Sequence, residues 1–386
     1  MSEKVRILHI IKTLNLGGAE VNLLNLLRVV DQDRFECHVA YSFGGELEPK
    51  FKEAGIKLFK YANKDYKVKS LATIGILANL AQYILNQRIQ IVHTHNFSAH
   101  IWGSIAAKLT ACKIVEHVHD LRYLDPEEFA RRRGFNNQYK YIHKFRNVSD
   151  RVVVLTKQNE EFLIKEKIYP KDKIREILNG IPMDGSPTSN CECRSIRPKA
   201  FSDDKKELIV LTPVRVAPEK NMDLILRIVP EVIRQIPNAV FLIAGDGPLY
   251  LKMVDEIKKM GLENNIKMIG YHPDIQTLLK DTDVFLLPSF LELHSIAILE
   301  AMSLRIPVVI SKDVGCNSEF IEDWQNGVLL DPFKDEGWSQ AIVCLLKDQQ
   351  LRQQMGNKGY QTCLEKFNIK DTVRRFEDLY VELTRV

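Results

Sequence analysis

Short apolar runs alternate with helical patterns along most of this chain, and this alternation constrains the fold more than any other feature. Each run has the length of a buried strand, and the residues after it have the apolar spacing of a helix. In the first half the strand-like runs are Val5–Ile11, Glu36–Ser42, Ile89–His93, Lys113–Val118 and Arg151–Leu155. Strands that alternate with helices predict a parallel sheet that is covered on both faces.

The alternation stops between Met183 and Asp204, where glycine, proline, serine and aspartate replace the apolar runs. It then starts again, with strands predicted at Leu208–Val214, Val240–Ala244, Asp283–Leu287 and Pro307–Ser311 and helices at Met222–Gln235 and Ser295–Leu304. We therefore predict an α/β fold of two doubly wound domains. The predicted boundaries are 1–182 for the N-terminal domain, 183–205 for the linker, 206–370 for the C-terminal domain, and 371–386 for a helix that crosses back to the N-terminal domain. Because open α/β sheets bind ligands beyond the carboxyl ends of their strands, two such domains facing each other would form a cleft.

The composition excludes several classes of protein. The chain has 386 residues, of which 45% are hydrophobic and 27% charged, so fibrous, disordered and disulfide-stapled folds are excluded. The seven cysteines are scattered, and the close pair Cys191 and Cys193 lacks the second pair of a metal knuckle, which favours reduced thiols. Met1–Arg6 runs directly into a strand and no apolar stretch is long enough to span a bilayer, so we expect a cytoplasmic protein.

The net charge of +4 conceals an asymmetry between the two halves. Residues 1–200 hold 32 Lys and Arg against 22 Asp and Glu, a balance of +10, whereas residues 201–386 hold 22 against 28, a balance of −6. Such a split indicates either that the basic half meets an anionic surface or ligand, or that two ordinary domains have different surfaces.

Two carboxylates flank the predicted start of a helix in the second half. Glu300 is the only charge in the apolar helix after Ser295, and glutamate is rarely buried without a partner. Glu292, eight residues earlier, would lie in the preceding loop, so both carboxylates would border the free N–H groups near His294–Ile296. Carboxylates suit ribose and sugar hydroxyls, and a helix N-terminus suits a phosphate. A structural salt bridge is the alternative interpretation of Glu300.

Two cations follow the first strand of the second half. Arg215 and Lys220 lie in one loop, where a planar guanidinium and a compact ammonium suit a diphosphate.

In the first half, Gly17 and Gly18 lie between a strand and a helix and would let a ligand approach the backbone, although a tight turn explains them equally well. The spacing is not that of a dinucleotide-binding loop.

Four histidines lie near strand ends in the first half: His93, His95, His117 and His119. Alternation along a strand puts His117 and His119 on the same side. No carboxylate pattern completes a metal site, so we expect no metal and favour one histidine presented to a polar substrate.

Taken together, these residues resemble the retaining glycosyltransferases of family 4, which have the two-domain GT-B architecture. Glu292 and Glu300 match the E-x7-E motif of that family, and Arg215 and Lys220 match its R-x4-K pair. Further matches in the same order are Gly17-Gly18-Ala19-Glu20, His119-Asp120, Asn179-Gly180-Ile181, Gly245-Asp246-Gly247-Pro248, Pro288-Ser289 and Gly315 with Glu319. The resemblance covers essentially the whole chain.

The resemblance implies a role for each matched position. Arg215 and Lys220 would neutralise the leaving nucleoside diphosphate, Glu300 would hold the ribose, and Glu292 would orient hydroxyls of the donor sugar. The resemblance implies further donor contacts from the backbone of Leu293, His294, Ser295 and Ile296, from Gly17 and Gly18 at the β-phosphate, from Gly245, from Tyr271 near the base and from His119 at the sugar. It also implies an enzyme that needs no metal or other cofactor.

The chain departs from the family pattern at several positions where glycine is common. Leu293, Arg305 and Cys316 each replace such a glycine, Asn221 replaces the one after Lys220, and Ser295 replaces a frequent glycine or proline. None of these changes removes a charged group that the chemistry needs, so we expect an active enzyme.

The resemblance also implies the partners: a nucleotide-sugar donor and a glycan or lipid-linked glycan acceptor of a cell-envelope pathway. A basic and aromatic stretch over residues 129–146 would suit an anionic membrane at the inner face, although a solvated helix face explains it equally well. We expect no nucleic-acid partner. A nucleotide-sugar epimerase and a non-catalytic nucleotide-sugar-binding subunit are the alternative functions.

Overall fold

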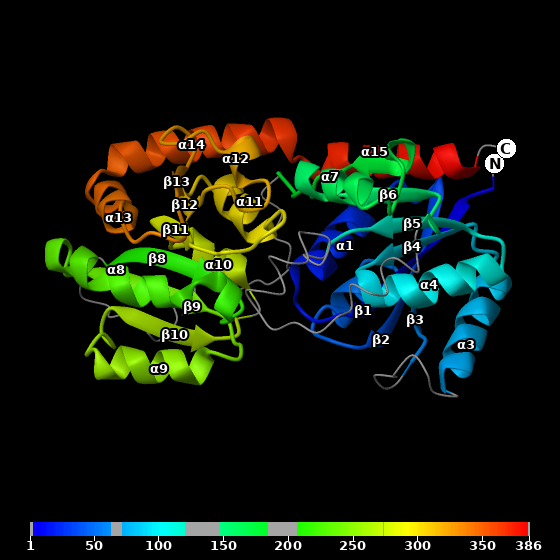
Figure 1. The fold of residues 1–386 in the computed structure, drawn as a ribbon, viewed down its shortest axis with the longest axis horizontal. Coiled ribbons are helices and arrows are strands. Elements are labelled where there is room, and N and C mark those ends of the chain that lie inside the picture. The colour runs from blue at the N-terminus through cyan, green and yellow to red at the C-terminus, as the bar shows by residue number, and fades with distance from the viewer. Residues whose placement is uncertain (1–2, 63–71, 120–146, 184–206, 273, 385–386) are drawn as a thin grey trace. The chain divides into compact units, whose positions relative to one another are not determined.

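The computed structural model describes residues 3–62, 72–119, 147–183, 207–272 and 274–384. The chain divides into two compact units, one made of Met1–Gly180 with Ile369–Val386 and the other of Ile181–Asn368 (Figure 1). We call them the N-terminal and the C-terminal domain and describe each by itself. The predicted linker, with Cys191 and Cys193, lies largely outside the described residues. So do Asp120 and the basic and aromatic stretch over 129–146.

The N-terminal domain contains a seven-stranded parallel sheet in the order β3-β2-β1-β4-β5-β6-β7. Its strands are β1 Val5–Thr13, β2 Phe35–Phe43, β3 Lys57–Lys60, β4 Ile91–His95, β5 Lys113–His117, β6 Arg151–Val154 and β7 Ile174–Glu176. The order reverses between β1 and β4, which is the point where doubly wound sheets bind ligands. Its helices are α1 Gly18–Val29, α2 Glu48–Glu53, α3 Ala72–Asn86, α4 Phe97–Leu109, α7 Lys157–Lys165 and α15 Ile369–Thr384.

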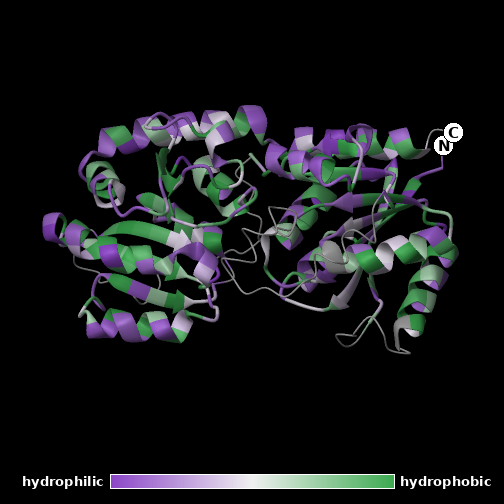
Figure 2. Ribbon diagram, viewed as in Figure 1, coloured by the Kyte–Doolittle hydropathy of each residue, from purple (hydrophilic) through white to green (hydrophobic). Residues whose placement is uncertain are grey.

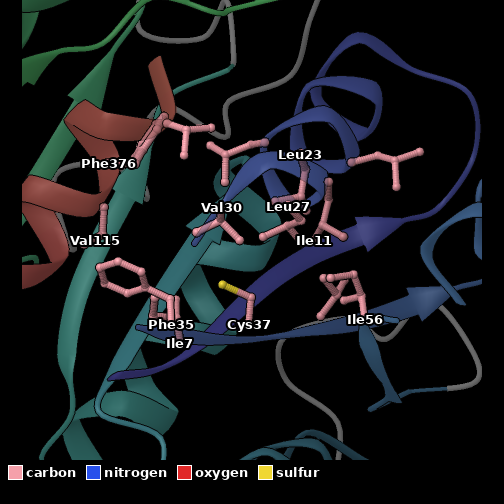
Figure 3. Close-up of a cluster of buried hydrophobic side chains, with 14 of the residues drawn as sticks. Ile7, Ile11, Leu23, Leu27, Val30, Phe35, Cys37, Ile56, Val115 and Phe376 are labelled. Carbon is pink, nitrogen blue, oxygen red and sulfur yellow. The ribbon is translucent and has the colours of Figure 1, made fainter. Parts of the chain in front are cut away.

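Alternation along β1 gives this sheet its two cores. Ile7 and Ile11 face α1 and α15, whereas Leu8 and Ile10 face α3 and α4. Figure 3 shows the first core, with Phe376 of α15 close to Val115 of β5 and with Leu23 of α1 over the sheet. Since α15 contributes six buried side chains to this core, the last stretch of the chain is part of the N-terminal domain.

The C-terminal domain contains a six-stranded parallel sheet in the order β10-β9-β8-β11-β12-β13. Its strands are β8 Leu208–Pro213, β9 Ala239–Ala244, β10 Ile266–Gly270, β11 Val284–Leu287, β12 Val308–Ser311 and β13 Val328–Leu330. Its helices are α8 Met222–Gln235, α9 Tyr250–Lys259, α10 Ile275–Lys280, α11 Ile296–Ser303, α12 Asn317–Phe320, α13 Trp338–Lys347 and α14 Gln349–Lys366. The strands are mainly hydrophobic, while helices such as α9 and α14 carry hydrophilic stretches (Figure 2).

The α/β fold class with two doubly wound parallel sheets is confirmed, and each predicted strand is present with ends shifted by at most two residues. Thr156 is the N-cap of α7, since its hydroxyl accepts a hydrogen bond from the backbone N–H of Asn159. Among the described residues, no helix combines the length and the apolar character that a membrane crossing needs.

Candidate functional site

Lys220 and Glu292 form the centre of the candidate site in the C-terminal domain. Lys220 ends a short 3-10 turn after β8, and Glu292 lies in the loop between β11 and α11. The Lys220 Nζ to Glu292 Oε1 distance is 2.5 Å, and the Ser289 hydroxyl donates to the same oxygen at 2.8 Å. With only 18% and 12% of their side chains exposed, this is a sheltered ion pair. The two functional groups predicted from separate motifs therefore lie in contact.

Arg215 lies at the other end of the same loop and is exposed. Its side chain makes no ion pair or hydrogen bond with the described residues of the domain, which leaves all of its donors for a ligand. Lys220 is held by a carboxylate and Arg215 is not, so the two cations differ in how firmly the fold positions them.

Helix α11 begins at Ile296, four residues after Glu292 of the ion pair. Its N-cap is Ser295, whose side chain makes no capping hydrogen bond, so the N–H groups of the first turn keep their capacity for a ligand. Leu293 and His294 are buried just before it. The backbone oxygen of Leu293 accepts from the N–H of Cys316 at 3.0 Å, which fixes this turn to the loop after β12.

His294 is a buried neutral ring. Burial lowers its pKa to about 3. It packs against Phe320 and Phe367, with ring centroids 5.8 Å and 5.0 Å away. Its side chain therefore supports the turn, and only its backbone is suited to contact a nucleotide-sugar substrate.

Glu300 lies in the second turn of α11, as predicted, and is partly buried. Burial raises the pKa of its carboxyl to about 7, against the effect of a hydrogen bond with the Gln276 side chain, and the Asp274 carboxylate adds to the rise. Near neutral pH this carboxyl can therefore donate or accept a hydrogen bond, and both suit a diol such as ribose.

Gly245 and Gly247 let the end of β9 approach the loop that carries Arg215. Gly245 has φ of +151°, and a Cβ there would lie 1.8 Å from the backbone oxygen of Val214. A Cβ on Gly247 would lie 2.3 Å from the oxygen of Val216. Gly245 thus lets the end of β9 pack against the loop that carries Arg215 and Lys220. Tyr271, just after β10, is 44% exposed on the surface of the domain.

Two departures from the family pattern lie at left-handed backbone positions. Asn221 has φ of 52° and Arg305 has φ of 60°, where glycine is the least strained residue. Asparagine tolerates this region better than most residues, and the Asn221 side chain also donates to the backbone oxygen of Pro332 at 2.9 Å. Arg305 stacks its guanidinium 3.8 Å from the centroid of the Tyr360 ring. The fold therefore accommodates both substitutions.

The glycine pair of the N-terminal domain lies at the start of α1, with Gly17 as the N-cap. A Cβ on Gly17 would meet the Glu20 carboxylate at 2.4 Å, whereas nothing lies within 4 Å of a Cβ on Gly18. Burial raises the pKa of Glu20 to about 7. Gly18 therefore borders open space, as a residue that contacts a ligand would.

His119 is the outer member of a row of histidines in the N-terminal domain. Its Nε2 lies 3.1 Å from His95 Nδ1, and His95 Nε2 lies 3.1 Å from His9 Nδ1. Burial lowers the pKa of His119 and of His9 to about 3, so these rings are neutral. Sequence reasoning missed His9, although the alternation of β1 places it on the same side as Ile7 and Ile11.

Ser289, Asp274 and Gln276 were also not predicted as contacts of the two glutamates. The residues that the structure brings together in the C-terminal domain are Lys220 with Glu292, and Glu300 with Gln276 and Asp274. Gly17, Gly18 and His119 belong to the N-terminal domain.

Models of known protein families match both domains. A model described as Glycosyltransferase Family 4 matches residues 16–184, and one described as Glycosyl transferases group 1 matches residues 194–362. The chain is a glycosyltransferase of the family 4 type. Each model matches one of the two Rossmann-like domains, and together they cover all of the predicted site residues.

Individual relatives of the chain are also glycosyltransferases by name. The glycosyltransferase is 25% identical to the UDP-Gal:alpha-D-GlcNAc-diphosphoundecaprenol alpha-1,3-galactosyltransferase of Escherichia coli, over 98% of this chain and 97% of that one. It is 25% identical to the alpha-D-kanosaminyltransferase of Streptomyces kanamyceticus, over 76% and 77%. The fold is shared with HepE of Anabaena, solved in complex with UDP-glucose, with a TM-score of 0.80, 20% identity and coverage of 98% and 99%. The glycosyltransferase therefore has the GT-B architecture.

Proposed function

We propose that this glycosyltransferase moves a hexose-type sugar from a nucleoside-diphosphate donor to a hydroxyl acceptor with retention of anomeric configuration. The observation that carries the proposal is the Lys220–Glu292 contact of 2.5 Å beside the uncapped start of α11. An ammonium and free backbone N–H groups suit a diphosphate, and the neighbouring carboxylate suits sugar hydroxyls.

The charge that develops on the leaving diphosphate is met by protein groups. Arg215 and Lys220 supply two positive charges, and the first turn of α11 supplies the partial positive charge of a helix N-terminus. These groups stand in for the cation that a metal would provide, so the proposed transfer needs no metal or other cofactor. Glu300 binds the ribose and Tyr271 lies near the base.

The proposed reaction proceeds on one face of the sugar. The bond from C1 to the diphosphate oxygen breaks with oxocarbenium character, the acceptor oxygen bonds to C1 from the same face, and the departing phosphate takes the acceptor proton. No enzymatic nucleophile is needed. In this proposal His119 contacts the transferred sugar, and Gly17 and Gly18 contact the β-phosphate.

The proposed acceptor is a glycan or lipid-linked glycan. The E. coli relative acts on an α-D-GlcNAc-diphosphoundecaprenol, which supports an acceptor of this class. An acceptor held in a membrane would bring the enzyme to the inner face of that membrane.

The test is transfer from UDP-hexoses to lipid-linked and free glycan acceptors, with the anomeric configuration of the product read by NMR. Lys220→Ala and Glu292→Gln are each expected to lower kcat/KM by about 10²–10³-fold, because each removes a charge preorganised for the transition state. The matched control is Lys259→Ala, which breaks an exposed lysine–glutamate pair of 2.7 Å on α9 in the same domain and should leave transfer unchanged.

Three results would contradict the proposal. Turnover of Lys220→Ala within a few-fold of wild type would reject the site. Isomerisation of the donor without transfer would indicate an epimerase, and nucleotide-sugar binding without turnover would indicate a non-catalytic subunit.

A further inference from the structure

Five histidines gather on one face of the N-terminal sheet, at the carboxyl ends of its three central strands. They are His9 on β1, His93 and His95 on β4, His117 on β5 and His119 just after it. The strand register pairs His9 with His93 and His95 with His117, which places their rings side by side. The ring centroids of neighbours lie between 3.8 Å and 5.5 Å apart. This face of the sheet is the one covered by α15.

Several ring nitrogens of this cluster are buried without a hydrogen-bond partner among the described residues. Both nitrogens of His117 are in this state, and so is one nitrogen each of His9 and His93. His117 is 1% exposed, so bulk water does not reach it. An unsatisfied buried polar atom costs about 1–3 kcal/mol, and several in one place call for an ordered water or an ion.

Three of the rings can share one ion. One ring nitrogen from each of His95, His117 and His119 lies within 4.8 Å of the other two. Nitrogens bound to one tetrahedral zinc ion lie roughly 3.3 Å apart, given zinc–nitrogen bonds of about 2.0–2.1 Å. The His95 Nδ1 to His119 Nε2 distance is already 3.1 Å. The rings therefore need only a small closure to reach metal-binding geometry.

We propose that His95, His117 and His119 form a binding site for one borderline transition-metal ion such as zinc. His119 is the partly exposed member of the three, so an ion and its fourth ligand would enter from the side of His119. Three neutral imidazoles leave the charge of the ion uncompensated, so hydroxide or another anion occupies that position. Three histidines can bind zinc without a carboxylate, so the lack of a carboxylate pattern in the sequence does not exclude this site.

The surroundings of His95 suit this role. When its Nδ1 binds the ion, its Nε2–H donates to His9 Nδ1 at 3.1 Å, and such a second hydrogen bond fixes the tautomer of a ligating histidine. Burial keeps the pKa of all three rings below the ordinary value, so protons do not compete for the nitrogens at neutral pH.

A second group of three, His9, His93 and His95, also lies within 4.8 Å. All three of its members are buried, which gives an ion no path of entry, and it shares His95 with the first group. We therefore expect one ion per chain, with the nitrogens of His9 and His93 outside its ligand set.

The test measures metal binding by the full chain without a polyhistidine tag. Equilibrium dialysis against Zn²⁺ should give one ion per chain, and Co²⁺ should give the visible absorption of a tetrahedral site. Mg²⁺ and Ca²⁺ should not bind, because both prefer oxygen ligands. His119→Gln, whose side chain is partly exposed and should not disturb folding, is expected to weaken Zn²⁺ binding at least tenfold. His272→Gln, a partly exposed histidine of the C-terminal domain, is the matched control and should bind as wild type.

Any of three results would overturn the site. They are wild-type protein that retains no Zn²⁺ and shows no tetrahedral Co²⁺ absorption, His119→Gln that binds like the control, and a cobalt–thiolate charge-transfer band, which would assign the ion to cysteines. None of these readouts depends on donor or acceptor, so the site can fail while the proposed transferase activity stands.

Discussion

At the scale of single residues, Glu300 links the stability of the C-terminal domain to its proposed ribose contact. Its pKa is about 7 in the fold and near 4.5 in the unfolded chain. As the pH rises from about 4.5 to 7, the unfolded state loses the proton first, so this carboxyl lowers the stability of the fold across that window, and the loss is complete above it. The position therefore keeps a destabilising acid where a neutral amide would be more stable.

We predict that Glu300→Gln raises the melting temperature of the protein at pH 8 and lowers the affinity for the donor. Glutamine cannot ionise, so the stability lost above pH 7 is recovered, at about 2–4 °C for each kcal/mol. Well below pH 4.5, where Glu300 is protonated in both states, the variant should melt close to wild type. Transfer should fall at least tenfold, because an amide replaces an ionisable contact. An equal gain in melting temperature at both pH values would show that burial of the carboxylate is not the cause.

The charged residues of the site were readable from the sequence, and their supporting contacts were not. Lys220 and Glu292 stand out because charges interrupt apolar patterns at the ends of strands. Ser289 and Gln276, by contrast, look like ordinary loop and helix residues until the fold brings them to a carboxylate. The backbone requirement at Arg305 is also invisible in the sequence, because arginine itself gives no sign of a left-handed conformation.

At the scale of elements, the sequence predicted best what lies in the middle of each sheet. The central strands β1, β8 and β11 are mainly apolar, whereas β3, at the edge, has only four residues, none of them fully buried. Edge strands lack the apolar pattern that burial on two faces imposes, so β3, β7, β10 and β13 were missed. His9 was missed for the opposite reason, because a single histidine inside an apolar strand reads as part of the core.

The close approach of β8 and β9 gives a prediction at this scale. Gly245→Ala should destabilise the protein by about 2–5 kcal/mol, since the new Cβ overlaps the oxygen of Val214 and the backbone becomes strained. The fraction of the Gly245→Ala variant that does fold should bind nucleoside diphosphate weakly, because the loop with Arg215 and Lys220 is displaced. Chemical denaturation and calorimetric titration with UDP measure the two effects.

Gly261→Ala is the matched control for this variant. Gly261 has φ of +66° and nothing within 4 Å of the position of a Cβ, so alanine there brings backbone strain without a collision. It should cost about 1–2 kcal/mol and leave UDP binding unchanged. Equal losses of UDP affinity in both variants would mean that the contact between the two strand ends does not position the cation loop.

At the scale of the whole molecule, the chain builds two domains, each with its own core residues, and uses its last helix in the N-terminal one. The apolar stripe of α15 can be read from the sequence at Ile369, Val373, Phe376 and Tyr380. These side chains pack with α1 and the sheet of the N-terminal domain, so α15 is part of the core of that domain. The cations proposed for the diphosphate belong to the acidic half, so the donor does not account for the excess of positive charge in residues 1–200.

Two separately packed domains in one chain predict that each can be destabilised or stabilised without the other. Phe376 is 1% exposed and packs against His93 and His117, so Phe376→Ala should cost the N-terminal domain about 3–5 kcal/mol. Arg215, Lys220, Glu300 and the start of α11 all belong to the C-terminal domain, so UDP should still bind this variant. At 100 times its Kd, UDP should stabilise the C-terminal domain by about 2.7 kcal/mol. Scanning calorimetry should therefore show Phe376→Ala with an early transition that UDP does not move and a later one that UDP raises. A single transition that shifts as a whole with both the substitution and UDP would mean that the two domains unfold as one unit.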